Sequence, residues 1–351
     1  MVHFQHQRQG TASTPGRRLG ALAAALAPSP TAAGRKLPST MKAMLVTEAG
    51  LVLEVISTPE ARSGQVLIEI HASSVNPVDY KIYEGRHESE RKFPWQPGFD
   101  ISGVVVAVGA GCERLKIGDE VWVDNAGRLG AAAEFAACDE SRVGLKPSSL
   151  SHAEAASLPL VALTSLQTLQ HGHVAKGSKV LIIGGSSGCG YTGAMLAIGM
   201  GAHVTATCST RNVEFVTGLG IERVVDYTKH DWAEELKGEE FDCVVDMIGP
   251  GGGEDHTVPR AAPCMAPNGR FISITTADDE GAFEGTDRVF EHIVTVSDNY
   301  QDLDILRTSV DAGELKPVVN ASFPLGELAA AYEMSKTHRT VGKIAILVKD
   351  N

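Results

Sequence analysis

The chain has 351 residues, 43% of them hydrophobic and 21% charged, which is ordinary for a globular protein of two domains. No segment approaches the roughly 18 consecutive apolar residues of a membrane span, which excludes a spanning helix. The net charge of -12 argues against a nucleic-acid partner, because phosphate binding requires a basic face.

The first 40 residues differ in composition from the rest of the chain. They contain no Asp or Glu, five basic residues and many Ala, Ser, Thr and Pro. This composition is typical of a transit peptide and predicts a chloroplast or mitochondrial location. The alternatives are an untargeted disordered extension of a cytoplasmic protein, or an upstream start with Met41 as the true initiator.

Residues 41–147 are predicted to be an all-β region. The candidate strands, separated by glycine turns, are 41–46, 51–58, 65–75, 101–109 and 116–123. In the third of these, Val66, Ile68 and Ile70 alternate as in a half-buried strand.

The pattern changes at Ser151. Residues 151–172 predict helices, with Ser151 as an N-cap and Glu154 completing a capping box. Strands at 179–185, 203–209, 223–228, 242–249 and 269–276 then alternate with helices at 191–201 and 211–220. This alternation predicts an α/β fold with a parallel, doubly wound sheet. Beyond residue 299, a helix, a strand, a helix and a strand are expected to return to the first domain.

The sequence KVLIIGGSSGCGYTGAMLA, residues 179–197, carries the strongest chemical signal. A buried strand enters a turn of small residues and then a helix, which lets the backbone approach a pyrophosphate at the helix N-terminus. We therefore predict a dinucleotide site. Its expected contacts are Gly185, Ser186, Ser187, Gly188, Cys189 and Gly190. For Cys189 we expect a packing role.

The strand that follows indicates which dinucleotide binds. NAD-binding proteins carry an Asp or Glu after this strand to hold the ribose 2′-OH, whereas this strand ends in Cys208, Ser209, Thr210 and Arg211. Two hydroxyls and a guanidinium suit a 2′-phosphate, so NADPH is the predicted cofactor. The alternative is that Arg211 is a solvated charge at a helix start. Gly249, at the carboxyl end of a later strand, is a further candidate contact.

Several motifs in this order resemble the zinc-independent quinone oxidoreductase branch of the medium-chain dehydrogenase/reductase superfamily. They are SSVNPVDYKIYEG (73–85), PGFDISGVVVAVG (97–109), LPLVALTSLQTL (158–169), the glycine loop, VVDYT (224–228), KPVV (316–319) and GKIAILV (342–348). The resemblance covers nearly all of residues 41–351. The segment 76–81 and the HRTVGK close (338–343) are similar to the alkenal/one oxidoreductase subgroup.

The resemblance implies two domains and no zinc. A Rossmann cofactor domain is expected over 159–301, and a mostly-β GroES-like catalytic domain over 41–158 and 302–351. In the zinc alcohol dehydrogenases a cysteine ligand occupies the place of Asn76, and a GHE motif stands where this chain has residues 98–100. Without that cysteine and histidine these positions cannot form a tetrahedral zinc site.

The resemblance implies reduction, with NADPH, of the activated C=C bond of an enone or alkenal. Quinone reduction is the alternative, and a non-catalytic relative with a structural or interaction role is a second. We expect a homodimer, with a monomer as the alternative.

The resemblance also implies roles for single residues. Asn76 would donate to the enolate oxygen, unless it is only a turn former. Lys81 or Tyr83 would assist by charge or proton donation, with water as the alternative donor. Thr164 is expected at the nicotinamide end, and Tyr227 near the adenosine 2′-phosphate. Asp79 and Asp100 are interpreted as structural, in a cap or salt bridge.

Overall fold

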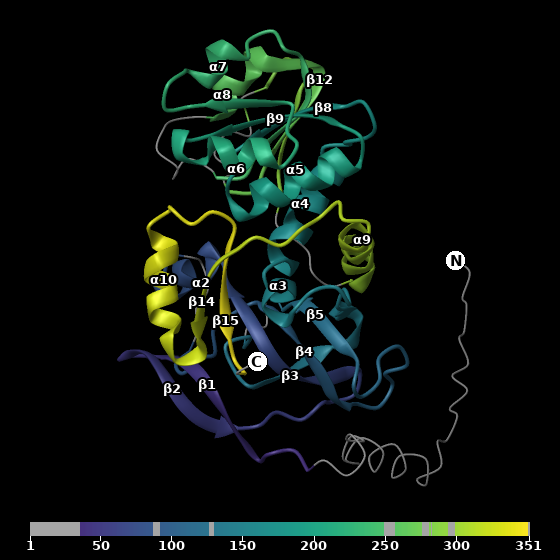
Figure 1. Ribbon diagram of the computed structural model, residues 1–351, viewed down its shortest axis with the longest axis vertical. Coiled ribbons are helices and arrows are strands. Elements are labelled where there is room, and N and C mark those ends of the chain that lie inside the picture. Colours follow the sequence, from purple (N-terminus) through teal and green to yellow (C-terminus); the bar gives the residue numbers. More distant parts are fainter. Residues whose placement is uncertain are drawn as a thin grey trace, which may run out of the picture.

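The computed structural model describes residues 36–86, 92–125, 130–248, 257–275, 281, 283–293 and 299–349. Within these ranges the chain forms two lobes, each built on its own sheet, with α4 (Pro159–His171) lying between them (Figure 1). No described helix is both long and apolar enough to cross a membrane.

The lobe that carries both ends of the described chain is mostly β. Its main sheet has the order β14-β15-β3-β4-β5-β7, with β6 paired to β3, and β1 and β2 form a separate hairpin. The strands are β1 (Thr40–Thr47), β2 (Gly50–Ser57), β3 (Gln65–Val75), β4 (Asp100–Val108), β5 (Glu120–Asp124), β6 (Phe135–Asp139), β7 (Gly144–Leu145), β14 (Val319–Pro324) and β15 (Lys343–Leu347). The helices are α2 (Pro77–Tyr83), η1 (Glu140–Arg142), α3 (His152–Ala156), η5 (Leu325–Glu327) and α10 (Leu328–Lys336).

The C-terminal strand completes this sheet. β15 pairs antiparallel with β3 and parallel with β14, which confirms the predicted return of the chain to the first lobe.

The other lobe has a six-stranded, wholly parallel sheet of order β10-β9-β8-β11-β12-β13. Its strands are β8 (Lys179–Ile183), β9 (His203–Cys208), β10 (Arg223–Asp226), β11 (Phe241–Asp246), β12 (Met265–Ser273) and β13 (Val289–His292). The helices of this lobe are α5 (Gly188–Gly199), η2 (Thr210–Asn212), α6 (Val213–Gly218), α7 (Trp232–Glu235), α8 (Thr257–Ala261) and η4 (Ala262–Cys264). The last helix, α9 (Tyr300–Asp311), contacts α4 and β7 and lies beside the β-rich lobe (Figure 1).

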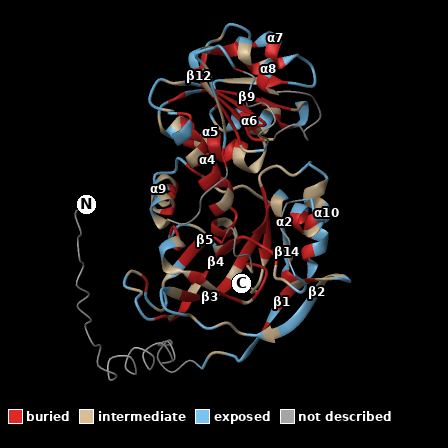
Figure 2. Cartoon of the chain, turned by 180° about the vertical axis from the view of Figure 1, so that it is seen from behind, coloured by how far each residue is buried: buried red, intermediate tan, exposed pale blue. Residues whose placement is uncertain are grey.

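Helices cover both faces of the parallel sheet, so the doubly wound α/β fold is confirmed. Val180 and Ile182 of β8 pack into a core that includes residues of α5, whereas Leu181 and Ile183 face a second core with α7 and α8. Figure 2 shows these strands buried beneath the more exposed helices. Strands buried on both faces read as continuous apolar runs, which is why KVLII was recognisable.

Two expectations for the β-rich lobe are wrong. A helix, α2, interrupts the region expected to be all β, because Asn76 and Asp79 form a capping box and Pro77 occupies the first turn. β3 is also not half-buried. Leu67 and Glu69, between the predicted inward residues, are only 1% and 5% exposed, since neighbouring elements cover both faces of this strand.

The N-terminal boundary lies slightly earlier than expected. β1 begins at Thr40, the carbonyl of Ser39 accepts from the N–H of Thr58, and Leu37 packs against a buried cluster. Residues 1–35, which hold most of the predicted leader, lie outside the described residues.

Candidate active site

The glycine loop joins β8 to α5, where the sequence predicts a dinucleotide site. Ser187 is the N-cap of α5, and its Oγ accepts from the N–H of Gly190 at 3.0 Å. Gly185 is tied to β9 by its N–H, which donates to the carbonyl of Thr207 at 2.9 Å. A side chain on Gly190 would collide with the carbonyl of Gly184, so only glycine fits there. A helix N-terminus leaves backbone N–H groups without intrahelical partners, so this end of α5 could bind an anion.

The other predicted loop residues support this geometry. The Oγ of Ser186 accepts from the side-chain amide of Asn212 at 2.8 Å, which joins the loop to α6. Gly188 is the first residue of α5. Burial raises the pKa of Cys189 to about 12, so the thiol stays protonated at neutral pH, consistent with packing and not with redox reactivity.

The end of β9 carries the residues predicted to hold the 2′-phosphate. In the described part of the chain the buried Oγ of Ser209 has no hydrogen-bond partner, which leaves it available to a ligand. Arg211 is exposed, and its guanidinium donates to the carbonyl of His338 at 3.1 Å. The side chain of Tyr227, which follows β10, is 45% exposed. An orphaned hydroxyl, an exposed guanidinium and an exposed phenol fit a phosphorylated ribose.

Thr210 differs from this expectation. Its hydroxyl donates to Asp226 at 2.6 Å and is therefore committed to a carboxylate at the end of β10. Although burial opposes ionisation, hydrogen bonds from Thr210 and Thr228 lower the pKa of Asp226 to about 2. Sequence reasoning missed Asp226, although its place at the carboxyl end of a strand next to β9 was a usable signal.

Asn76 lies between β3 and α2, and it is fully buried. Its Nδ2 donates to Oδ2 of Asp100 at 2.7 Å, and its Oδ1 accepts from Nζ of Lys343 at 2.7 Å. Its backbone N–H donates to Asp79 at 2.7 Å. The amide thus sits between a carboxylate and an ammonium, which fixes its orientation.

The two acidic residues near Asn76 have the structural roles that were predicted. Asp100 accepts from the hydroxyl of Ser74 at 2.6 Å and from the N–H of Leu160 at 2.7 Å, so it ties β3 and α4 to β4. Asp79 completes the capping box of α2. Burial raises the pKa of Asp79 to about 8, despite the N–H of Asn76 and the charge of Lys343.

Lys81 and Tyr83 occupy different surroundings on α2. Lys81 is exposed. Tyr83 is half-buried, packs with Tyr332 at a ring distance of 6.2 Å, and brings its hydroxyl near Gly50. The structure therefore places Tyr83 toward the β1–β2 hairpin and not beside the Asn76 amide.

Thr164 lies in α4 and is 5% exposed, with its hydroxyl donating to the carbonyl of Leu160 at 2.7 Å. Gly249 lies outside the described residues. Within the described ranges no group of three or more His, Cys, Asp or Glu could hold a metal ion.

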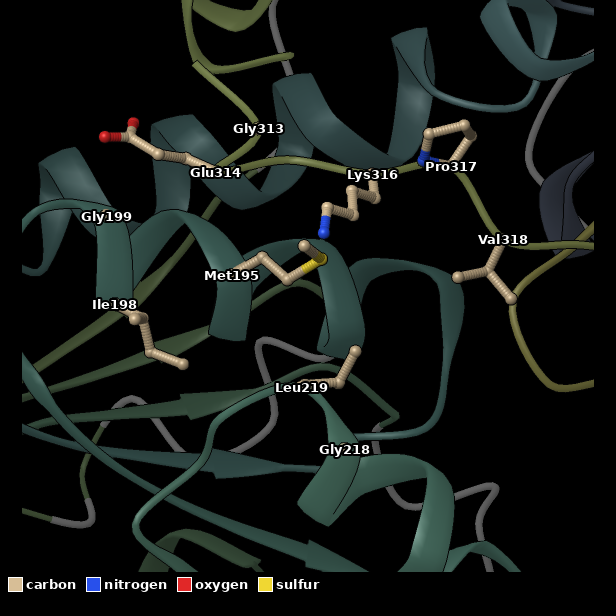
Figure 3. A pocket seen from close by; sticks show the side chains of 10 residues that line it. All are labelled: Met195, Ile198, Gly199, Gly218, Leu219, Gly313, Glu314, Lys316, Pro317 and Val318. Carbon is tan, nitrogen blue, oxygen red and sulfur yellow. The ribbon is translucent and has the colours of Figure 1, made fainter. Parts of the chain in front are cut away.

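A separate hollow of about 450 Å³ lies between the second half of α5 and residues 313–318 (Figure 3). Met195, Ile198 and Leu219 form its apolar part, and Lys316 extends over Met195. The residues of α5 that line the hollow lie in the second half of this 12-residue helix, whereas the glycine loop precedes its first residue. We assign it no cofactor contact.

Comparison with known proteins bears on these features. The sequence family described as alcohol dehydrogenase GroES-like domain matches residues 62–156, and the family described as zinc-binding dehydrogenase matches residues 219–346. The chain is 33% identical to 2-methylene-furan-3-one reductase of Solanum lycopersicum, over 88% of this chain and 80% of that protein. It is 31% identical to the chloroplastic NADPH-dependent alkenal/one oxidoreductase of Arabidopsis thaliana, over 90% and 81%.

A similar solved structure is the quinone oxidoreductase from Coxiella burnetii, with a TM-score of 0.80 and 29% identity. The match covers 88% of this chain and all of that chain.

Proposed function

This chain belongs to the quinone oxidoreductase branch of the medium-chain dehydrogenase/reductase superfamily, and from that premise we propose that it reduces the activated C=C bond of α,β-unsaturated carbonyl compounds with NADPH. The observation that carries the proposal is the buried Asn76 amide, held in one orientation at the position where the zinc enzymes of the superfamily carry a ligand. The relatives named as 2-methylene-furan-3-one reductase and alkenal/one oxidoreductase support this substrate class.

Bound NADPH would supply the hydride. When the β-carbon of an enone accepts it, the π pair of the C=C bond shifts to the bond between the α-carbon and the carbonyl carbon, and the π pair of the C=O bond moves onto the oxygen to give an enolate. One Nδ2 hydrogen of Asn76 is committed to Asp100, and the other is the donor that we assign to this oxygen. The proton that completes the reaction goes to the α-carbon from the exposed Lys81 or from water. Tyr83, whose hydroxyl lies near Gly50, is assigned no step.

Reduction of quinones is the second candidate, because relatives and a similar structure carry that name. NADPH oxidation by the full chain, measured against a panel of 2-alkenals, vinyl ketones and quinones, separates the two. We expect turnover of vinyl ketones and 2-alkenals to exceed turnover of quinones. Turnover of quinones alone would favour the second candidate, and turnover of none would favour a non-catalytic role.

NADPH, not NADH, is the proposed cofactor. The support is the orphaned Ser209 hydroxyl and the exposed Arg211 guanidinium at the end of β9, where the chain has no acid. We also propose that the reaction needs no zinc, because the two ligand positions that the resemblance implies hold an amide, Asn76, and a buried phenylalanine, Phe99, in place of cysteine and histidine.

The location and assembly of the protein are further proposals. The composition of residues 1–40 and the chloroplastic and mitochondrial relatives support an organellar location, which fractionation of cells expressing the tagged full chain would test.

A homodimer is proposed because, among the described strands, β13 ends the parallel sheet with a single neighbour. Light scattering would measure the mass.

A further inference from the structure

Lys343 is a buried cation beside the proposed site. It is the first residue of β15 and is 3% exposed. Its Nζ donates to the carbonyl of Val75 at 2.6 Å and to Oδ1 of Asn76 at 2.7 Å, and lies 3.6 Å from Oδ2 of Asp100. Burial lowers the pKa of Lys343, and the carboxylates of Asp100 and Asp79 oppose this shift. A buried amine is costly unless it is paired, and three oxygens surround this one.

The charges around Asn76 permit only one orientation of its amide. An ammonium offers only donors and an ionised carboxylate only acceptors, so Oδ1 must face Lys343 and Nδ2 must face Asp100. Turning the amide over would set its NH₂ group against the ammonium and its oxygen against the carboxylate. The direction of the second Nδ2 hydrogen, which we assign to the substrate carbonyl, is therefore set by Lys343 and Asp100 together.

Lys343 and the preceding Gly342 also contact the glycine loop. The Cδ of Lys343 lies 3.3 Å from the place that a Cβ would take on Gly188. The N–H of Gly342 is 3.5 Å from the carbonyl of Ser186. Gly342 has a φ of 72°, and a side chain there would collide with Val318, so this close passage requires glycine. Residues 342–343 thus touch the cofactor loop on one side and Asn76 on the other.

We propose that Lys343 is a positioning residue, which holds the Asn76 amide with its free N–H toward the substrate carbonyl and aligns it with the cofactor loop. The proposal rests on the proposed function for its catalytic consequence, but the orientation of the amide does not depend on which acceptor is reduced. Lys343 itself touches neither hydride donor nor acceptor, and it acts through Asn76.

Steady-state kinetics with a vinyl ketone test whether the positioning by Lys343 contributes to turnover. We expect Lys343→Met to lower kcat by about 10- to 100-fold, with KM and the Kd for NADPH within about threefold of wild type. Lys343→Arg, which keeps a donor-only cation, should recover part of the loss. Lys179→Met is the matched control, because Lys179 also begins a strand but is exposed, and its Nζ donates to the carbonyl of Glu239. The control should keep wild-type kcat.

A double-mutant cycle with Asn76→Ala shows whether Lys343 acts through Asn76. We expect Lys343→Met to cost less than about threefold in kcat when Asn76 is already Ala, because the group that it positions is gone. Full turnover by Lys343→Met, or costs that multiply in the double mutant, would overturn the proposal. If Lys343→Met fails to fold by circular dichroism, Lys343→Leu, which also has no hydrogen-bond donor in its side chain, replaces it in the cycle, and the ¹⁵N exchange of Asn76 in Lys343→Arg against wild type is measured beside it.

Side-chain NMR tests the orientation of the Asn76 amide independently of turnover. The chain has seven asparagines, so protein labelled with ¹⁵N only at asparagine should give few NH₂ pairs, and Asn76→Ala identifies the relevant one. We expect that pair to exchange slowly with solvent in the wild type and at least tenfold faster in Lys343→Met. Unchanged exchange would overturn the positioning role, whereas a wild type that reduces no enone would overturn the proposed function alone.

Discussion

Arg211 is the residue on which the proposed choice between NADPH and NADH depends most directly. We expect NADPH to bind at least about tenfold more tightly than NADH, which is about 1.4 kcal/mol. Arg211→Ala should remove most of this difference and leave NADH affinity nearly unchanged, because NADH has no 2′-phosphate and the other partner of Arg211, the carbonyl of His338, is on an exposed residue. Fluorescence titration with both cofactors measures this. Arg223→Ala is the control, since that arginine pairs with Glu235 and Glu239 in the same lobe. Equal affinities in the wild type would contradict the assignment.

Asn76→Ala removes both a proposed donor and the partner of two buried charges. We expect kcat/KM for a vinyl ketone to fall by roughly 10- to 1000-fold, while NADPH affinity stays within about threefold. The free energy of unfolding should also fall by about 1–3 kcal/mol, because Lys343 and Asp100 lose a hydrogen-bonding partner. Asn320→Ala, on an exposed position of β14, should change neither quantity. Wild-type turnover by Asn76→Ala would leave the residue as a turn former.

Asp79 should make stability depend on pH. Burial raises its pKa from 3.8 to about 8, so protonation stabilises the folded state. That contribution is complete below pH 3.8 and is lost as the pH rises toward about 8. Asp79→Asn keeps a neutral acceptor for the backbone N–H of Asn76. Because the asparagine does not ionise, the variant should not lose this stability as the pH rises. Urea unfolding gives the free energy of unfolding of both proteins at about pH 5 and about pH 8.5. Between these pH values we expect the difference, Asp79→Asn minus wild type, to increase by at least about 1 kcal/mol. An equal difference at both pH values would contradict the shifted pKa.

The long-range partners of these residues were beyond sequence reasoning. Lys343 and Asn76 are separated by 267 positions, and the local sequence around either residue does not indicate that the two are in contact. The apolar strand that Lys343 opens was no signal either, because Lys179 opens a similar apolar strand and is exposed. Likewise, Thr210 was predicted as a phosphate contact because the proximity of Asp226, on a neighbouring strand, was not visible. The structural interpretation of Asp79 and Asp100 was correct.

At the scale of elements, α5 illustrates what local chemistry predicts. The expected helix began at Tyr191, whereas the helix begins at Gly188, because Ser187 caps it and the glycines belong to its first turn. β3 was predicted over its observed range, Gln65–Val75, since its apolar run is long. The capping box of Ser151 and Glu154 was also confirmed. The short α2 was missed because tertiary packing, not an apolar period, sustains a helix of seven residues.

Gly190 tests the start of α5. Gly190→Ala would force a Cβ against the carbonyl of Gly184, so we expect a loss of about 1–3 kcal/mol in the free energy of unfolding and at least tenfold weaker NADPH binding. Gly218→Ala is the matched control, because Gly218 ends a helix, has no atom within 4 Å of the added Cβ and should leave both values unchanged. Thermal unfolding and cofactor titration give the two quantities. Wild-type affinity in Gly190→Ala would show that the loop is not the pyrophosphate cradle.

At the scale of the whole molecule, the two sheets bring the glycine loop of one lobe and the Asn76 segment of the other to the same residue, Lys343. β15 makes this arrangement, because it lies in the β-rich sheet (Figure 1), while its first residue, Lys343, and the preceding Gly342 contact the glycine loop. The fold class and the return of the chain were predictable, since both follow from the order of apolar segments. The domain boundaries at 158–159 and 301–302 stay predictions, as does the role of residues 1–40 in targeting.

The transfer of hydride to the β-carbon of an enone is the central claim, and isotope transfer tests it most directly. The full chain is incubated with a vinyl ketone and NADPH that carries deuterium at the transferred position, and the product is examined by NMR and mass spectrometry. We predict a saturated ketone with one deuterium on the β-carbon and none on the carbonyl carbon. An alcohol with deuterium on the carbinol carbon, or no deuterium transfer to any vinyl ketone or 2-alkenal tested, would contradict the claim.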